Sequence, residues 1–175
     1  MGERKWEVWD KNLTDRIAKA SWLSPKECLD TGGKKGGIHW KLITKIAPLI
    51  EGNSVFDVAC GLGHLYILIK NKEYLGIDNS ENMIQKCHEY FPEDTTRFQM
   101  GDAYNLGGYP TFDTVTAVGL ILHLPDPEPV IKGLWEKAKR CLILTAWIGS
   151  TELLKETPTD TKILIERRDT VESLN

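Results

Sequence analysis

The chain has 175 residues, of which 41% are hydrophobic and 27% charged, so it fits one globular domain with a continuous core. Its net charge of -3 and pI of about 5.8 argue against a general nucleic-acid binder, which would usually be basic. No apolar run approaches the roughly 20 residues that a membrane-spanning helix needs, so no membrane partner is expected.

The N-terminal part of the sequence predicts helices joined by a glycine-rich loop. Apolar residues recur at helical spacing over residues 6–20, which indicates an amphipathic helix with an aromatic face. That face either packs on the domain or forms a lid over a ligand pocket. The glycines of residues 31–37 indicate a flexible loop, and residues 38–49 predict a second helix. We expect residues 1–50 to cap a ligand-binding part that spans residues 51–175 of the same domain.

Beyond residue 50 the pattern alternates between short apolar strands and helices. Strands are predicted at residues 54–58, 73–77, 97–100, 114–118 and 141–146, and helices at residues 65–70, 80–90 and 128–139. Because the strands are apolar throughout, they indicate a parallel sheet covered by helices on both faces. Right-handed crossovers make such a sheet doubly wound, so the predicted fold class is α/β with a doubly wound, mostly parallel sheet. Ligands in this fold bind outside the carboxyl ends of the strands.

The first predicted strand ends in a turn that contains two glycines. Gly61 and Gly63 stand between the strand and the next helix, where they let the backbone approach a ligand closely. A dinucleotide-binding fingerprint would need a third glycine where this chain has Tyr66, which disfavours a nicotinamide-dependent oxidoreductase. Asp57, inside the motif, is also foreign to that fingerprint and suits a ligand with a positive amino group.

The next two predicted strands each end at an aspartate. Asp78 closes the second strand, where one carboxylate can accept both hydroxyls of a ribose. Its alternative role is an Asx turn into the next helix, which Asn79 and Ser80 could form without it. Asp102 closes the third strand and could accept an exocyclic amine, but Gly-Asp is also a common turn dipeptide. The sequence alone leaves both roles of Asp102 open.

Taken in order, these motifs resemble those of the Rossmann-like (class I) S-adenosylmethionine-dependent methyltransferases, in particular their small-molecule branch. The likeness spans roughly residues 52–147 and includes the segment around His123, which follows the fourth strand. The resemblance implies a Rossmann-like methyltransferase fold and S-adenosylmethionine as the cofactor. It also implies an enzyme that transfers a methyl group by in-line displacement to an acceptor. The sequence favours a small molecule as this acceptor and leaves a protein as the alternative.

The resemblance also assigns roles to residues. Gly61 and Gly63 would make room for the methionine part of the cofactor, and Asp57 would contact its ammonium group, directly or through water. Met83 would pack on the adenine. The full set of expected cofactor contacts is Asp57, Ala59, Cys60, Gly61, Gly63, Asp78, Asn79, Met83, Gly101, Asp102, Ala103 and Val118.

The histidines are the candidates for contacts on the substrate side. His123 is expected to contact the reacting groups as a catalytic residue, and its alternative role is to cap the following turn. His39 and its neighbour Trp40 follow the glycine-rich loop and could reach the mouth of the cofactor site. His64 is expected at the start of a helix and His88 in solvent. The spacing of these histidines supports no metal site.

Two further features bear on the function. Complete members of the family normally add two antiparallel strands after the fifth, whereas here only residues 162–167 predict a further strand. We therefore expect a shortened C-terminus, which makes a non-catalytic partner subunit that binds S-adenosylmethionine the second alternative. The oligomeric state is left open.

The cysteines and the N-terminus predict the compartment. Cys28, Cys60, Cys87 and Cys141 are scattered at apolar positions and indicate reduced, buried thiols. The charged N-terminus lacks the apolar stretch of a signal peptide. Together these features predict a cytoplasmic protein.

Overall fold

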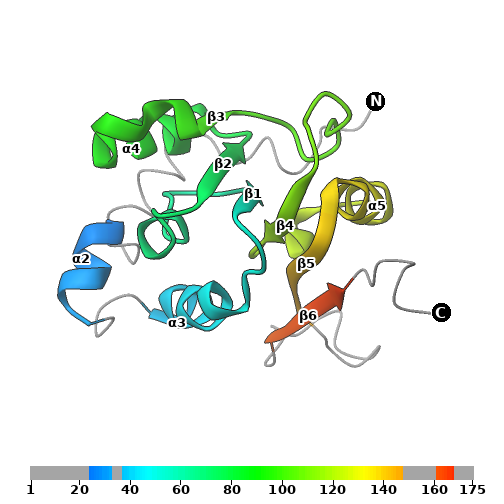
Figure 1. Ribbon diagram of the computed structural model, residues 1–175, viewed down its shortest axis with the longest axis horizontal. Coiled ribbons are helices and arrows are strands. Elements are labelled where there is room, and N and C mark those ends of the chain that lie inside the picture. The colour runs from blue at the N-terminus through cyan, green and yellow to red at the C-terminus, as the bar shows by residue number, and fades with distance from the viewer. Residues whose placement is uncertain (1–23, 33–36, 148–160, 168–175) are drawn as a thin grey trace.

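The computed structural model describes residues 24–32, 37–147 and 161–167 of the chain (Figure 1). Its strands form one sheet in the order β3-β2-β1-β4-β5-β6. They are β1 (Ser54–Val58), β2 (Glu73–Asp78), β3 (Phe98–Met100), β4 (Phe112–Ala117), β5 (Ala138–Trp147) and β6 (Thr161–Arg167). The pairs from β3 to β5 are parallel and β6 lies antiparallel to β5, which confirms the mostly parallel sheet.

Helices cover both faces of this sheet, with α3 and α4 on one side of the strands and α5 on the other (Figure 1). The α-helices are α2 (Pro25–Asp30), α3 (Gly37–Ile46), α4 (Glu81–Tyr90) and α5 (Glu128–Lys137). The 3-10 helices are η2 (Ala47–Leu49), η3 (Tyr66–Leu68), η4 (Pro92–Arg97) and η5 (Ile121–His123). The helix predicted at residues 6–20 lies outside the described residues. Within the described ranges, no helix is long and apolar enough to cross a membrane.

Successive strand residues pack into opposite cores, which explains why the strands are apolar throughout. In β1, Val55 packs with α3 and α4, whereas Phe56 and Val58 pack with α5. The same alternation occurs in β5, where Ile143 joins the first core and Leu142 the second. Because side chains alternate along a strand, each core takes every second residue. The doubly wound architecture is therefore confirmed residue by residue.

The helix predicted at residues 65–70 is wrong, because only the single 3-10 turn η3 forms there. Tyr66 is buried in an aromatic cluster, with its ring edge-on to Phe91 and Phe98 at centroid distances of 5.0 and 5.2 Å. The segment is apolar on every side, so it lacks the polar face that a surface helix would show. Burial of the whole turn therefore replaces a regular helix between β1 and β2.

The boundary between α5 and β5 also differs from the prediction. Helix α5 ends at Lys137, and Ala138, expected on the helix face, is the buried first residue of β5. Ala138 pairs with Phe112 of β4, and the register shifts before the next paired residues. Pairing with β4 thus ends the helix earlier than its apolar periodicity suggested.

Candidate functional site

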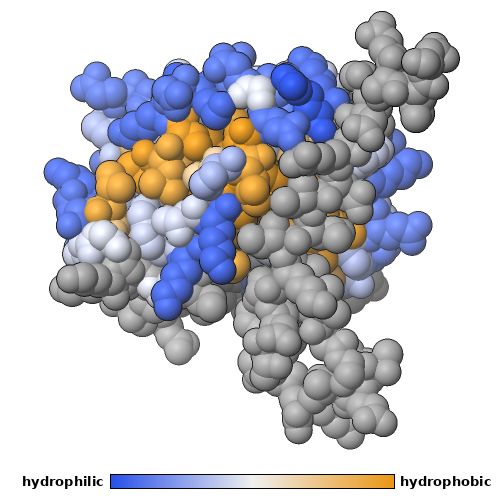
Figure 2. All heavy atoms as spheres, turned by 60° about the horizontal axis from the view of Figure 1, so that its bottom comes forward, coloured by the Kyte–Doolittle hydropathy of each residue, from blue (hydrophilic) through white to orange (hydrophobic). Residues whose placement is uncertain are grey.

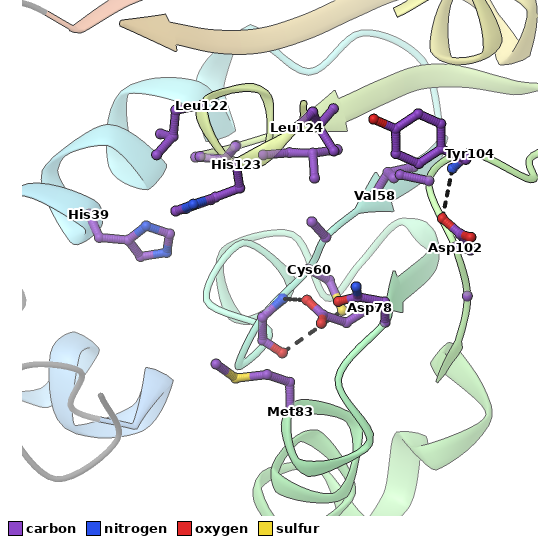
Figure 3. Close-up of a pocket in the computed structure, with 18 of the residues that line it drawn as sticks. His39, Val58, Cys60, Asp78, Met83, Asp102, Tyr104, Leu122, His123 and Leu124 are labelled. Atoms are coloured by element: carbon purple, nitrogen blue, oxygen red, sulfur yellow. Dashed lines mark hydrogen bonds between the residues drawn. The ribbon is translucent and has the colours of Figure 1, made fainter. Parts of the chain in front are cut away.

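A cavity of about 320 Å³ lies at the carboxyl ends of the parallel strands (Figure 3). This volume falls at the lower end of the range for ligand pockets, about 300–1,000 Å³. The strand order reverses between β1 and β4, so the cavity occupies the switch point where α/β sheets bind ligands. Most residues expected at the site line it, namely His39, Ala59, Cys60, Gly61, Asp78, Asn79, Met83, Gly101, Asp102, Ala103, Val118 and His123.

The loop after β1 presents its backbone to the cavity. Ala59 and Gly61 both have left-handed backbone conformations, with φ of 63° and 55°. Such a conformation is uncommon for a residue with a Cβ, and it turns the chain sharply at the end of the strand. The Cys60 amide donates a hydrogen bond of 2.9 Å to the carbonyl of Ile77. Strand β2 therefore fixes the position of the glycine turn.

Asp78, at the end of β2, both holds this turn and lines the cavity. Its Oδ2 accepts a 3.0 Å hydrogen bond from the Gly61 amide, and its Oδ1 accepts one of 2.9 Å from the Ser80 amide. The Asx turn into α4 thus forms, and the carboxylate still faces the cavity (Figure 3). Burial raises the pKa of Asp78, against the opposing effect of these backbone hydrogen bonds.

The third strand ends at the same cavity. Asp102 lines it, and its Oδ1 accepts a 2.9 Å hydrogen bond from the Tyr104 amide (Figure 3). The turn expected as the alternative is therefore present, and the aspartate also reaches the ligand site. A Cβ on Gly101 would lie 2.7 Å from the Tyr109 hydroxyl oxygen and 2.9 Å from Ile77, so no larger residue fits at this wall.

Asp57 does not line the cavity. Its carboxylate is buried inside the sheet, where Oδ2 accepts from the Tyr74 hydroxyl and Oδ1 from the Thr116 hydroxyl, both at 2.7 Å. Burial raises the pKa of Asp57 to about 6, although the hydrogen bonds from Thr116 and Tyr74 lower it. The contact between Asp57 and a cofactor ammonium group stays a prediction, because the carboxylate itself does not line the cavity.

Gly63 also lies away from the cavity, in the aromatic core. Its φ is 74°, and a Cβ there would stand 2.8 Å from the Phe91 ring and 3.1 Å from Phe98. The absence of a side chain at this position is explained by core packing, whereas the resemblance assigned it to the cofactor. The aromatic partners come from distant parts of the chain, so the local sequence gave no signal for them.

Replacing Gly63 with alanine is expected to lower the free energy of unfolding by about 2–4 kcal/mol, because it combines a left-handed backbone with overpacking. The matched control is Gly108→Ala, since a Cβ at Gly108 meets nothing within 4 Å. That variant should stay within about 1 kcal/mol of the parent. Urea denaturation of the three proteins measures the difference, and equal stability of both variants would contradict the assigned packing.

Trp40 and His39 follow one another on α3 but face different surroundings. Trp40 is buried and packs edge-on to His64, with ring centroids 6.2 Å apart, so it does not line the cavity. His39 lines the cavity and contacts the same His64 ring at 5.2 Å. Burial, assisted by the proximity of His64, lowers the pKa of His39 to about 3. Trp40 therefore packs against His64 and is not among the residues that line the cavity.

The other two histidines also have defined places. His123, in η5, lines the cavity and is exposed to solvent on one side. The protein that surrounds the rest of the ring lowers its pKa by burial. His88, expected in solvent, is half-buried, and its Nε2 lies 3.0 Å from the Phe98 carbonyl oxygen. No group of histidine, cysteine or acidic residues in the described ranges could hold a metal ion.

Several further residues line the cavity that the sequence did not predict, and most of them are apolar. They are Leu42, Val58, Tyr104, Gly119, Leu120, Leu122 and Leu124. The apolar segment around His123 was a usable signal, since it follows β4 directly and must cross the ends of the strands. For Leu42 no signal existed, because its position depends on how α3 packs across the sheet.

A family of known proteins matches this chain. Residues 55–142, just over half of the chain, match the family described as "Methyltransferase domain". No curated protein matched the sequence.

Solved structures show the same fold. Magnesium protoporphyrin IX methyltransferase (ChlM) from Synechocystis PCC 6803, with bound SAH, is 22% identical, with a TM-score of 0.63 over 84% of this chain and 72% of that one. CalS10, an amino pentose methyltransferase from Micromonospora echinaspora with bound SAM, is 18% identical, with a TM-score of 0.58 over 74% of this chain and 58% of that one. The [4+2]-cyclase SpnF is 22% identical, with a TM-score of 0.51 over 65% of this chain and 45% of that one.

The matched segment runs from Val55 in β1 to Leu142 in β5 and contains the glycine turn and Asp78. It also contains every strand end that lines the cavity. The family match and the sheet topology therefore point to one assignment, and the chain belongs to the methyltransferase-domain family, with a Rossmann-like fold.

Proposed function

We propose that this protein binds S-adenosylmethionine in the cavity and transfers its methyl group to a small-molecule acceptor. The observation that carries the proposal is the Asp78 carboxylate, which is buried at the end of β2, hydrogen-bonded to the Gly61 amide and part of the cavity wall. A carboxylate held in this way offers its remaining lone pairs to a diol such as the ribose hydroxyls.

The other walls of the cavity fit the rest of the cofactor. Met83 is buried beside Asp78 and supplies an apolar surface for the adenine. Asp102 offers an acceptor for the exocyclic amine, and Gly101 lines the cavity beside it. The open backbone at Gly61 leaves room for the methionine part. When bound, S-adenosylmethionine would supply an activated methyl group on a positively charged sulfur.

The residues of this chain would then act mainly by placing the two reactants. A cavity with largely apolar walls excludes water and orients the acceptor, and such positioning can contribute about 7–11 kcal/mol to catalysis. The small acceptor is favoured because the site is a pocket of limited volume. Relatives of similar fold that are described as acting on a porphyrin and on an amino pentose support the same choice.

A second function keeps the cofactor site but lacks methyl transfer. SpnF shares this fold and is a [4+2]-cyclase, so the fold alone does not establish the reaction. The nicotinamide alternative is less favoured, because Tyr66 occupies the position of the third glycine and is buried in the aromatic core. A cytoplasmic location is part of the proposal and is supported by four buried cysteines that are all free thiols.

Calorimetric titration of the pure protein with S-adenosylmethionine, S-adenosylhomocysteine and NAD tests the cofactor. We expect micromolar binding of the first two and none of NAD. Formation of S-adenosylhomocysteine with a panel of acceptors then tests methyl transfer. If neither S-adenosyl compound binds, the proposed function is wrong; if both bind without turnover on any acceptor, the non-catalytic alternative is favoured.

A further inference from the structure

The cavity has two chemically different ends. The carboxylates of Asp78 and Asp102 lie at the ends of β2 and β3 (Figure 3). The other end, between α3 and η5, carries leucines and two imidazoles, and its residues are His39, Leu42, Leu120, Leu122, His123 and Leu124. We call this set the leucine–imidazole end.

We infer that the leucine–imidazole end binds an uncharged aromatic acceptor with a phenolic hydroxyl, and that His123 takes the hydroxyl proton while the oxygen is methylated. This inference rests on the proposed function, because it places the acceptor beside the cofactor. It goes further by naming the class of acceptor and the atom that is methylated.

The charges around the cavity favour an uncharged acceptor. None of the described residues that line the cavity is a lysine or arginine, so none of them would pair with a carboxylate or phosphate there. An acceptor with an ammonium group would need a carboxylate at the leucine–imidazole end, and both lining carboxylates belong to the other end. An unpaired charge in an apolar pocket loses its hydration without compensation, so charged acceptors are disfavoured.

The apolar surface continues to the rim of this end. Leu122 is 47% exposed and lines the cavity, next to the exposed His123. Figure 2 shows that apolar side chains also form a broad area on one face of the molecule, bordered by hydrophilic residues. A leucine-rich wall gains most from an acceptor with a flat hydrocarbon body, since burial of apolar area is the main favourable contribution.

An uncharged hydroxyl must lose its proton to become a strong nucleophile. The pKa of a phenol is about 10, whereas that of water is about 15.7, and an unactivated hydroxyl resembles water in this respect. An imidazole is therefore a competent base for the phenol but not for the unactivated hydroxyl. Other ionisable lining groups are less suited. The Tyr104 hydroxyl donates to the Asp126 carbonyl at 2.8 Å, and the pKa of the Cys60 thiol is raised by its hydrogen bond with Cys87 and by burial.

The two imidazoles come from different elements and both point into the cavity (Figure 3). His39 is held against His64, and its low pKa of about 3 keeps it neutral, so it can accept a hydrogen bond but is a weak base. His123 is exposed at the rim and can pass a proton to water. We therefore assign proton removal to His123 and orientation of the hydroxyl to His39.

The proposed step is balanced. The hydroxyl proton moves to the His123 imidazole as the phenol oxygen forms a bond to the methyl carbon. The carbon–sulfur bond breaks, and its electron pair stays on sulfur, which becomes the neutral thioether of S-adenosylhomocysteine. His123 then releases the proton to solvent, so the net products are the methyl ether, S-adenosylhomocysteine and one proton.

Three naphthalene probes of one shape test the acceptor class with the full chain and S-adenosylmethionine. They are 2-naphthol, 2-naphthoic acid and 2-(aminomethyl)naphthalene. We expect S-adenosylhomocysteine formation and a methyl ether with 2-naphthol, at a kcat/KM at least tenfold above either charged probe. Preference for the acid or the amine would overturn the inference, as would failure of 2-naphthol to react with or bind to protein that binds S-adenosylmethionine.

His123→Gln tests the base, with His88→Gln as the matched control. We expect His123→Gln to lower kcat for 2-naphthol at least about 100-fold, a typical contribution of a general base, with unchanged affinity for S-adenosylhomocysteine and unchanged thermal unfolding. With the more acidic 6-cyano-2-naphthol at a pH where it is ionised, the same variant should approach the parent rate. His88→Gln should keep the parent kcat with both probes.

An equal loss of kcat on both naphthols in a folded His123→Gln variant would overturn the role of His123 as base. These outcomes are separate from the failure of the proposed function, which would appear as no binding of S-adenosylmethionine or S-adenosylhomocysteine to the parent protein.

Discussion

Replacing Asp78 with alanine is expected to weaken binding of S-adenosylmethionine by at least about 100-fold. A hydrogen bond to a charged group contributes about 1.5–3 kcal/mol, and the proposed site uses two of them on the ribose diol. The variant also loses the acceptors for the amides of Gly61 and Ser80, so the glycine turn would lose its anchor to β2. Calorimetric titration with S-adenosylmethionine and S-adenosylhomocysteine measures the loss.

Two further variants separate the ribose contact from folding. Asp126→Ala removes an exposed aspartate near the same end of the sheet and should leave the affinity within about twofold, since its side chain has no described role. Asp78→Asn keeps the size of the side chain but replaces one acceptor oxygen by a donor that faces the backbone amides. It should therefore also bind weakly. A folded Asp78→Ala protein with parent affinity would contradict the assignment of the cofactor site.

The sequence predicted the structure best where the fold itself requires a local residue pattern, as it does along the strands and at their ends. Apolar strands closed by polar residues predicted the sheet, because parallel strands are buried on both faces and end at one edge. Asp78 and Asp102 could be placed at the site for this reason alone. The turn and the place at the cavity, which the sequence offered as alternatives, both occur, since one carboxylate has enough lone pairs for both.

The expected site residues that do not line the cavity are those whose partners lie far along the chain. Gly63 meets Phe91, Asp57 meets Thr116, and Trp40 meets His64. A motif states which residue types stand near one another in sequence, but these contacts arise only when β1 pairs with β4 and α3 crosses the loop after β1. Leu42 was not predicted to line the cavity for the same reason, since its place depends on how α3 packs.

The buried Asp57 is expected to make the stability of the protein fall as the pH rises from about 4 to 6. Burial raises its pKa from 3.8 to about 6 in the folded protein, so the folded state binds more protons than the unfolded state in this window. Stability then decreases with rising pH and levels off above about pH 7, where the carboxyl is ionised in both states. The loss between pH 4 and 7 amounts to about 2 kcal/mol.

Asp57→Asn isolates this effect, because asparagine keeps the shape without titrating. The difference in unfolding free energy between parent and variant, from urea denaturation at pH 4 to 7, should change by about 2 kcal/mol in the stated direction. A constant difference over this range would show that the carboxyl titrates near its ordinary value. In that case the hydrogen bonds from Tyr74 and Thr116 would offset the effect of burial on the pKa of Asp57.

The same titration decides whether Asp57 also serves the cofactor. A positive ammonium group near Asp57 would favour the ionised carboxylate, so affinity for S-adenosylmethionine should fall below about pH 6 in the parent and stay level in Asp57→Asn. Calorimetry at pH 5 and 8 distinguishes the cases. If both proteins show the same pH dependence, the titrating group is another one, such as Asp78, whose pKa burial also raises. Asp57 would then be a structural carboxylate that links β1 to β2 and β4 through Tyr74 and Thr116.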